Sequence, residues 1–546
     1  MRVAALTSVL ALAQLCLAEI QEPLGNTNQR DSESNNPLTE AFNDRVEWAL
    51  EHFHIPGIAI GVVRDGQTFA KGYGLSNISL STPVTPHTLF FVGSTTKAHT
   101  AAAISLLVDD NDKYPHIQWD TTLYSLIPEV FALSDPWYTT HVTITDMLSH
   151  RSGLPRHDMI MMQNITSREI IERMRYLPLT AEIRTKFQYC NLMYITAAYL
   201  VETVTGQSLG DFLKERVWGV LGMNETGFDL AAAVAEGRIV SEGYFFSEIE
   251  NKSISTDMVY NPALTGAGNI LTSVADYNKW IAALLSRSGP ISENGYNALF
   301  GAHTVASPLV NRPFASPDLY GFGWVLQTYN GERLIQHGGA QDGFGAFVLL
   351  LPERGFGFSI LGNDMVGMSA ASLVLGFELV DKILGIEAEK RFDWEGVIDD
   401  QMRRLKLTNE TLSALYPDLP SIPDLLPHPL NLSSYTGTYT HPAYPTIRVS
   451  SGSDCPLRKV LNSPEKWTGA RLCADFEDPV FLAVGSSFDI FHVSGTYWTA
   501  VFGAEGQTSA TRAAFRISPE GVVSEIGIEW DSEMIKKEEK IWLQRA

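Results

Sequence analysis

The stretch FVGSTTKAHTAAAISLLV, residues 91 to 108, sets the fold and the chemistry expected of this chain. It places Ser94 and Lys97 three positions apart at the start of an apolar run. If a helix begins near Ser94, both side chains lie on one face, and the lysine amine can approach the serine hydroxyl. The following residues are apolar on nearly every side, which predicts a buried helix with both polar groups at its entrance. A serine hydroxyl needs such a nearby base to act as a nucleophile.

Two further motifs follow this pair in the chain. KFQYCNLMY (186 to 194) contains the single Tyr-x-Asn of the sequence, Tyr189-Cys190-Asn191. QHGGA (336 to 340) places His337 before Gly338 and Gly339 at a predicted strand edge. Each motif alone is weak, since Tyr189 could be a core aromatic and Asn191 a turn amide. Their order supports a shared site.

With these motifs in this order, the chain resembles the serine beta-lactamase and penicillin-binding-protein superfamily. It is most similar to the class C beta-lactamase-like esterases and peptidases, whose motifs run S-x-x-K, Y-x-N and then K-T-G or a variant such as H-x-G. TITDMLSHRSGLP (143 to 155), GAGNILTSVADYNKW (266 to 280) and YGFGW (320 to 324) resemble framework segments of that family. The likeness covers about 40 to 385.

The patterning and the resemblance predict an α/β (α+β) fold, an antiparallel sheet covered by helices with an added helical subdomain. Two strands around Asp65-Gly66 predict a hairpin. Residues 333 to 364 predict three strands, broken at Gly338-Gly339 and at 353 to 355. Short alternating runs near the C-terminus predict a small all-β, barrel-like domain. The expected organisation is a signal peptide (1–18), a flexible lead-in (19–38), a catalytic domain (39–390), a connector (391–430) and the all-β domain (431–546).

The resemblance implies roles for the motif residues. Ser94 would attack an acyl carbonyl and become acylated, while Lys97 and Tyr189 manage its proton. Because the two groups are coupled, the base is not assigned to one of them. The oxyanion would bind to the backbone N–H groups of Ser94 and Ala340. Asn191 would hydrogen-bond the acyl side chain or Lys97, and Gly338 and Gly339 would leave room for substrate.

His337 departs from the lysine motif that helps to bind a substrate carboxylate in beta-lactamases and cell-wall peptidases. Histidine is mostly neutral at pH 7. This favours a secreted serine hydrolase acting on a small ester, lactone or amide, such as a secondary metabolite. Acyl transfer, true beta-lactamase or D-amino-acid peptidase activity, and an inert binding or scaffold protein are the alternatives. His337 could also be a structural strand residue.

The composition limits the classes of molecule that this protein is expected to bind. The 546 residues include 62 acidic and 40 basic side chains, for a formal net charge of -22. Such a surface repels phosphate backbones and anionic lipids, so a small-molecule acyl substrate is expected, with neither nucleic acid nor a membrane as partner. No H-E-x-x-H or H-x-x-E-H motif occurs, so neither a metal nor another cofactor is expected. The oligomeric state stays open.

The N-terminus predicts an extracellular, secreted protein. Residues 1 to 18 carry an early arginine, an apolar run and small residues before Glu19, the pattern of a signal peptide. In an oxidising compartment Cys455 and Cys473 are placed to form a disulfide, while Cys190 is expected to be a small buried filler. N-glycosylation sequons begin at Asn77, Asn164, Asn224, Asn251, Asn409 and Asn431.

Overall fold

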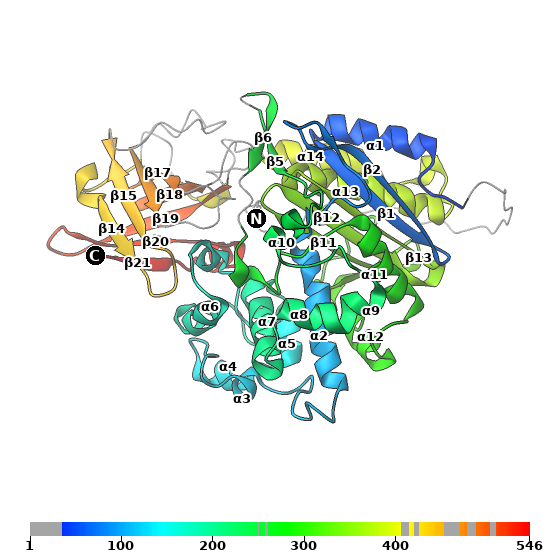
Figure 1. Cartoon of the computed structure of the whole chain (residues 1–546). Helices are drawn as coiled ribbons and strands as arrows, with labels where there is room; N and C mark the ends of the chain where they lie inside the picture. Colours follow the sequence, from blue (N-terminus) through cyan, green and yellow to red (C-terminus); the bar gives the residue numbers. More distant parts are fainter. Residues whose placement is uncertain are drawn as a thin grey trace.

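The computed structural model describes two bodies, a nine-stranded sheet flanked by helices and a closed β-barrel (Figure 1). It describes residues 35–248, 250–256, 260–405, 414–419, 425–452, 470–477, 487–502 and 509–546. The predicted fold class, an antiparallel sheet covered by helices with a small C-terminal all-β barrel, is confirmed.

The sheet brings the two ends of the α/β region together. Strands β1 and β13 pair side by side at its centre. The predicted hairpin is present, because Arg64 pairs with Gln67 across Asp65 and Gly66, both of which have positive φ. The strands, in sheet order, are β3 (Thr82–Pro83), β2 (Gln67–Asn77), β1 (Gly57–Arg64), β13 (Phe356–Gly362), β12 (Phe344–Leu351), β11 (Glu332–Gln341), β10 (Val325–Tyr329), β9 (Asp318–Tyr320) and β8 (Thr304–Ser307).

The predicted strand break at Gly338-Gly339 is wrong. Strand β11 runs through both glycines, and the chain turns instead after Gln341, with Gly343 at φ 74°. Gly339 is required by a close approach, since a Cβ there would lie 2.0 Å from the Val92 carbonyl oxygen. The glycine pair therefore serves a tertiary contact and not a turn.

The sheet is covered on both faces (Figure 1). Along β1, Ile58, Ile60 and Val62 pack into one apolar cluster, which includes residues of α1 (Glu40–His52) and α13 (Met365–Ile383). Ala59 and Val63 point the other way, into the cluster that contains α2 (Thr96–Asp109) and α11 (Val274–Ser286). This alternation is the period of a strand buried on both faces.

Helix α2 is the centre of the helical subdomain, and every residue from Thr96 to Val108 is buried, as the apolar run predicts. It packs against α7, α8 and α12. The remaining helices of this region are α3 (Leu123–Leu126), α4 (Pro136–His141), α5 (Ile144–Leu148), α6 (Ser167–Arg173), α7 (Asn191–Thr205), α8 (Leu209–Leu213), α9 (Gly219–Leu221), α10 (Leu230–Ala235) and α12 (Glu293–Leu299). The two-stranded sheet β5 (Gly243–Ser247) and β6 (Lys252–Thr256) accompanies them.

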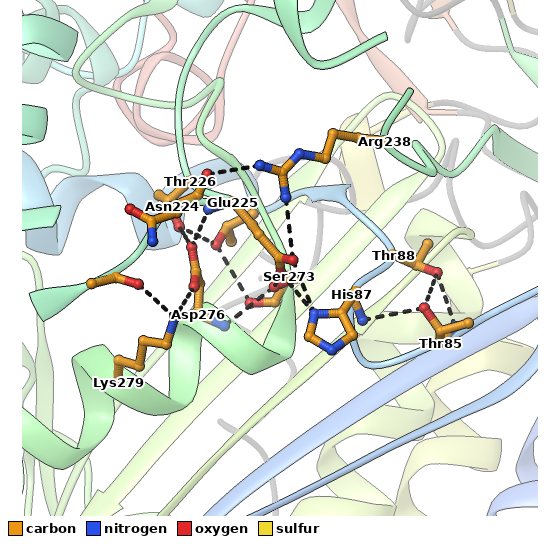
Figure 2. A network of polar contacts seen from close by, with 12 residues as sticks. Thr85, His87, Thr88, Asn224, Glu225, Thr226, Arg238, Ser273, Asp276 and Lys279 are labelled. Atoms are coloured by element: carbon orange, nitrogen blue, oxygen red, sulfur yellow. Dashed lines mark hydrogen bonds and ion pairs between the residues drawn. The ribbon is translucent and has the colours of Figure 1, made fainter. Parts of the chain in front are cut away.

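A short strand pair leads directly into Ser94. Strand β4 (Phe90–Phe91) pairs with β7 (Leu271–Thr272), and the 3-10 turn η2 (Gly93–Thr95) follows. A polar network braces this pair (Figure 2). The buried Asp276 carboxylate accepts from the Glu225 backbone N–H at 2.6 Å and from the Thr226 hydroxyl at 3.0 Å. Glu225 in turn accepts from Ser273 and bonds His87, so the network links the segment before β4 to the segment after β7.

The barrel follows α14 (Trp394–Leu405) in the chain. Its strands pair antiparallel in sequence order, and β14 pairs with β21 to close it. They are β14 (Gly437–Thr440), β15 (Ile447–Ser451), β16 (Arg471–Phe476), β17 (Ser487–Ser494), β18 (Tyr497–Phe502), β19 (Ser509–Ile517), β20 (Val523–Ile528) and β21 (Ile541–Arg545), with α16 (Ser532–Lys537) before the last strand. Within the described residues, every helix is too short or too polar to cross a bilayer.

Cys473 is disulfide-bonded and Cys190 is free and buried. The predicted partner of Cys473, Cys455, lies outside the described residues, as do the predicted signal peptide and Asn409.

Gly339→Ala should lower the free energy of unfolding by about 2 kcal/mol or more, because its methyl group would collide with backbone. Gly227→Ala is the matched control, since a Cβ there meets nothing within 4 Å. Urea unfolding of both variants measures the difference. Equal stability of the two variants would contradict the close contact between β11 and η2.

Candidate active site

Ser94 and Lys97 meet at the head of α2, as their spacing predicts. Ser94 lies in η2, and Lys97 stands in the first turn of the helix. The Lys97 Nζ lies 3.1 Å from the Ser94 Oγ. This is hydrogen-bond distance for proton transfer between an amine and a hydroxyl.

The Lys97 amine is completely buried. It donates to the Ala267 carbonyl at 2.7 Å, a contact that sequence reasoning missed. Burial lowers the pKa of Lys97 well below its ordinary value, and the positive charge of Arg156 lowers it further, while Asp158 opposes this. Burial therefore favours the neutral form of the amine, which can accept a proton.

The ring of Tyr189 faces the same amine. Its centroid lies 4.9 Å from the Lys97 Nζ. The Tyr189 hydroxyl is buried and makes no hydrogen bond of good geometry within the described residues, although Ser94 lies close enough to affect it. Burial raises the pKa of Tyr189, against the smaller lowering effects of Ser94 and Arg156. Burial thus favours the neutral amine of Lys97 and keeps Tyr189 a neutral phenol.

The segment that carries Tyr189 is pinned to the loop after α5. The Cys190 backbone N–H donates to His150 Nδ1 at 3.0 Å, and the Gln188 N–H donates to the His150 carbonyl at 2.8 Å. The His150 ring lies 4.4 Å from the Tyr189 ring. Burial raises the pKa of the Cys190 thiol to about 12, which fits the expected filler and not a nucleophile.

Two glycines interlock η2 with β11. A Cβ on Gly93, whose φ is 48°, would lie 2.6 Å from the Ala340 nitrogen. A Cβ on Gly339 would lie 3.2 Å from the Ser94 nitrogen. Pairing with β10 ends at Gln336, so residues 337–341 turn this edge toward η2. The backbone nitrogens of Ser94 and Ala340 therefore lie on facing segments, where an oxyanion would need them.

His337 has both ring nitrogens engaged. Nδ1 donates to the Gly338 carbonyl at 2.7 Å, and Nε2 accepts from the Tyr320 hydroxyl at 3.0 Å. The side chain is fully buried, and burial, with a smaller effect of Lys97, lowers its pKa to about 3. His337 is neutral here and belongs to the packing beneath the site.

Asn191 points to a partner that the sequence reasoning missed. Its Nδ2 donates to the Asp158 Oδ1 at 2.9 Å. Asp158 also forms an ion pair with Arg156 at 2.5 Å, and the Arg156 guanidinium lies 4.9 Å from the Tyr189 ring centroid. Both residues directly follow the framework segment that ends at Pro155, but no spacing in the sequence links them to Tyr189 or Asn191.

Within the described residues, the asparagines of the predicted glycosylation sequons lie at the surface. Asn164, Asn224, Asn251 and Asn431 are exposed, and Asn77 is partly exposed. No cluster of three or more His, Cys, Asp and Glu residues suited to a metal ion occurs in the described part of the chain.

The fold and the serine–lysine pair define a class, a hydrolase of the beta-lactamase fold. A model of the Beta-lactamase family matches residues 42–375, and the chain belongs to that family. A model of a domain of unknown function (DUF3471) matches residues 426–545.

Relatives extend over nearly the whole chain. An unguisins hydrolase of Aspergillus campestris (strain IBT 28561) is 36% identical over 94% of this chain and 93% of its own length. A second unguisins hydrolase, from Aspergillus violaceofuscus (strain CBS 115571), is 34% identical over 96% and 93%. Among solved structures, the octameric penicillin-binding protein homologue from Pyrococcus abyssi matches with a TM-score of 0.57 and 18% identity, over 89% of this chain and 97% of that one. This last likeness concerns the fold alone.

Tyr320→Phe should lower the free energy of unfolding by about 1–3 kcal/mol, because it leaves a buried ring nitrogen of His337 without a partner. Tyr124→Phe, at a side chain that is 42% exposed, should change it by less than about 0.5 kcal/mol. Thermal and urea unfolding measure both variants. An unchanged stability in Tyr320→Phe would remove the structural role of the His337–Tyr320 bond.

Proposed function

We propose that this protein is a secreted serine hydrolase that cleaves an amide bond in a secondary-metabolite peptide related to the unguisins. The observation that carries the proposal is the buried Lys97 amine, whose pKa burial lowers, 3.1 Å from the Ser94 hydroxyl. The two unguisins hydrolases, similar over nearly their whole length, support the substrate class.

Ser94 is the nucleophile and Lys97 its base. The neutral amine takes the Ser94 proton while Oγ attacks the amide carbonyl, and the resulting oxyanion binds to the N–H groups of Ser94 and Ala340. Tyr189, a neutral phenol beside both groups, passes a proton to the leaving amine and recovers one from Lys97. The C–N bond breaks, leaving an ester on Ser94. Water releases the acid by the same proton path in reverse.

The charges around Ser94 favour a neutral substrate. His337 is neutral, and Arg156 is paired with Asp158, so neither offers a spare positive charge to a substrate carboxylate. A peptide amide without a nearby carboxylate matches these surroundings better than penicillin does. Transfer of the acyl group to an amine or alcohol would use the same acyl-enzyme. The masses of the products distinguish transfer from hydrolysis.

Secretion and glycosylation are part of the proposal. The disulfide at Cys473 supports an oxidising compartment, where such bonds persist. The exposed sequons at Asn164, Asn224, Asn251 and Asn431 are accessible for glycan attachment.

Ser94→Ala should lower the rate of unguisin cleavage at least about 10³-fold, because the acyl-enzyme cannot form. The variant should stay folded. Product masses from wild type and variant, incubated with unguisin and with a p-nitrophenyl ester, provide the measurement. Addition of water to one amide supports hydrolysis, and addition of an amine supports transfer. Cleavage by Ser94→Ala at the wild-type rate would refute the nucleophile.

The pH profile of kcat/KM should retain full activity at neutral pH. Since the pKa of Lys97 is lowered, the amine stays neutral until the pH falls through that lowered value, and activity is lost only on the acidic side. Initial rates between about pH 4 and 9 test this. A rise in activity that begins only near the ordinary pKa of lysine would contradict a neutral Lys97 base.

A further inference from the structure

We propose that Arg156 and Asp158 are positioning residues that hold Tyr189 and Asn191 in their catalytic geometry, and that the C-terminal barrel anchors the segment carrying them. The inference deepens the proposed function and rests on it where catalysis is concerned. Neither residue belongs to the motifs that reveal the site in the sequence.

The first observation is the contact of one ion pair with both ends of the Tyr-x-Asn motif. The Arg156 guanidinium lies 4.9 Å from the Tyr189 ring centroid, a cation–π distance. Its partner Asp158 accepts from Asn191 Nδ2 at 2.9 Å through one oxygen and from Arg156 Nε at 2.5 Å through the other. A bridge of this kind fixes the ring of Tyr189 relative to the first residue of α7.

The second observation concerns His157, which lies between the two residues and faces the barrel. Its Nε2 donates to the Pro178 carbonyl at 2.9 Å, so the neutral ring accepts at Nδ1 from the Tyr444 hydroxyl, 2.6 Å away. His157 adopts φ 48°, a left-handed conformation that points neighbouring side chains to different sides. Arg156 and Asp158 thus reach the active site while His157 is held by the other domain.

Further contacts strengthen the docking of the barrel at this place. Gln163 donates to the Ala443 carbonyl at 2.8 Å, and Lys186 forms an ion pair with Glu533. Lys186 lies on the segment that carries Tyr189. The barrel therefore contacts the catalytic domain at His157 and Gln163 and again at Lys186, just before the motif that the ion pair supports.

The charges make the proposal testable apart from packing. Lys97 is faced by Arg156 from one segment, by Asp158 and Cys190, and by the neutral rings of His150 and His337. From the barrel, Asp531 faces Arg156 and His157, and Tyr444 adds its hydroxyl. Arg156 favours the neutral Lys97 amine and Asp158 favours its ammonium. Removing the Arg156 charge should therefore raise the pKa of Lys97, and removing the Asp158 charge should lower it.

The kinetic test compares Arg156→Met with Asp158→Asn, using a p-nitrophenyl ester that wild type cleaves through Ser94. Loss of the arginine raises the pKa of Lys97, so the acidic limb of kcat/KM should move up by about one pH unit. Asp158→Asn keeps an acceptor for Asn191 and should move the limb down. Arg156→Lys should restore the wild-type limb in part. Lower rates with unmoved limbs in both variants would overturn the electrostatic part of the proposal.

Hydrogen–deuterium exchange tests the positioning without any catalysis. Arg156→Met should speed exchange of a peptide covering residues 186–196 at least tenfold. The matched control is Arg168→Met, which breaks the ion pair with Glu172 on α6, an exposed pair away from Tyr189. Unchanged exchange in folded Arg156→Met would overturn the positioning role. Because this measurement needs no substrate, failure of the proposed function does not affect its outcome.

Tyr444→Phe tests the anchor from the barrel side. It removes only the hydroxyl that His157 accepts from, and it should speed exchange in residues 156–163 as well as 186–196. Tyr497→Phe, at an exposed side chain of the barrel, is the control. Exchange equal to wild type in Tyr444→Phe would refute the anchoring role of the barrel. Only the positioning role of Arg156 and Asp158 would then remain.

Discussion

The site depends on one steric constraint, the close approach of the turn before α2 to the edge of β11 beyond its pairing with β10. Gly93 and Gly339 permit it, since a Cβ on either would meet backbone atoms of the other segment. The approach sets the Ser94 and Ala340 nitrogens on facing segments. It also fixes the start of α2, and with it the place of Lys97. The strand pair before the turn and the Asp276 network behind it resist displacement of this contact (Figure 2).

Around this contact, burial determines the chemistry. The interior penalises charge, so burial lowers the pKa of Lys97 and raises that of Tyr189, and both shifts favour the neutral forms. His337 is neutral beneath them. A neutral amine beside a hydroxyl is a base ready for use, whereas an ammonium would first have to lose a proton. The charged pair Arg156 and Asp158 is partly exposed, and its charges still affect Lys97.

Local patterns revealed much of the molecule. Asp65-Gly66 identified a hairpin because a two-residue turn needs positive φ at both positions. The spacing of Ser94 and Lys97 identified their contact because helical periodicity brings such residues together. Contacts between segments that are distant in the sequence were harder to predict from sequence patterns. Gly338-Gly339 resembled a turn because close packing of two backbones selects glycine as a turn does. The Ala267 carbonyl that binds Lys97 is a backbone group, which no residue type marks. Arg156 and Asp158 lacked a spacing signal because their partners lie on another segment.

The most direct test of the central claim is a crystal structure of the protein after reaction with a fluorophosphonate. The account predicts a covalent bond to Ser94 Oγ, with one phosphonyl oxygen about 2.7–3.1 Å from both the Ser94 and the Ala340 nitrogens. It also predicts Lys97 Nζ still bonded to the Ala267 carbonyl. An adduct on another residue, or a phosphonyl oxygen turned away from Ala340, would contradict the account.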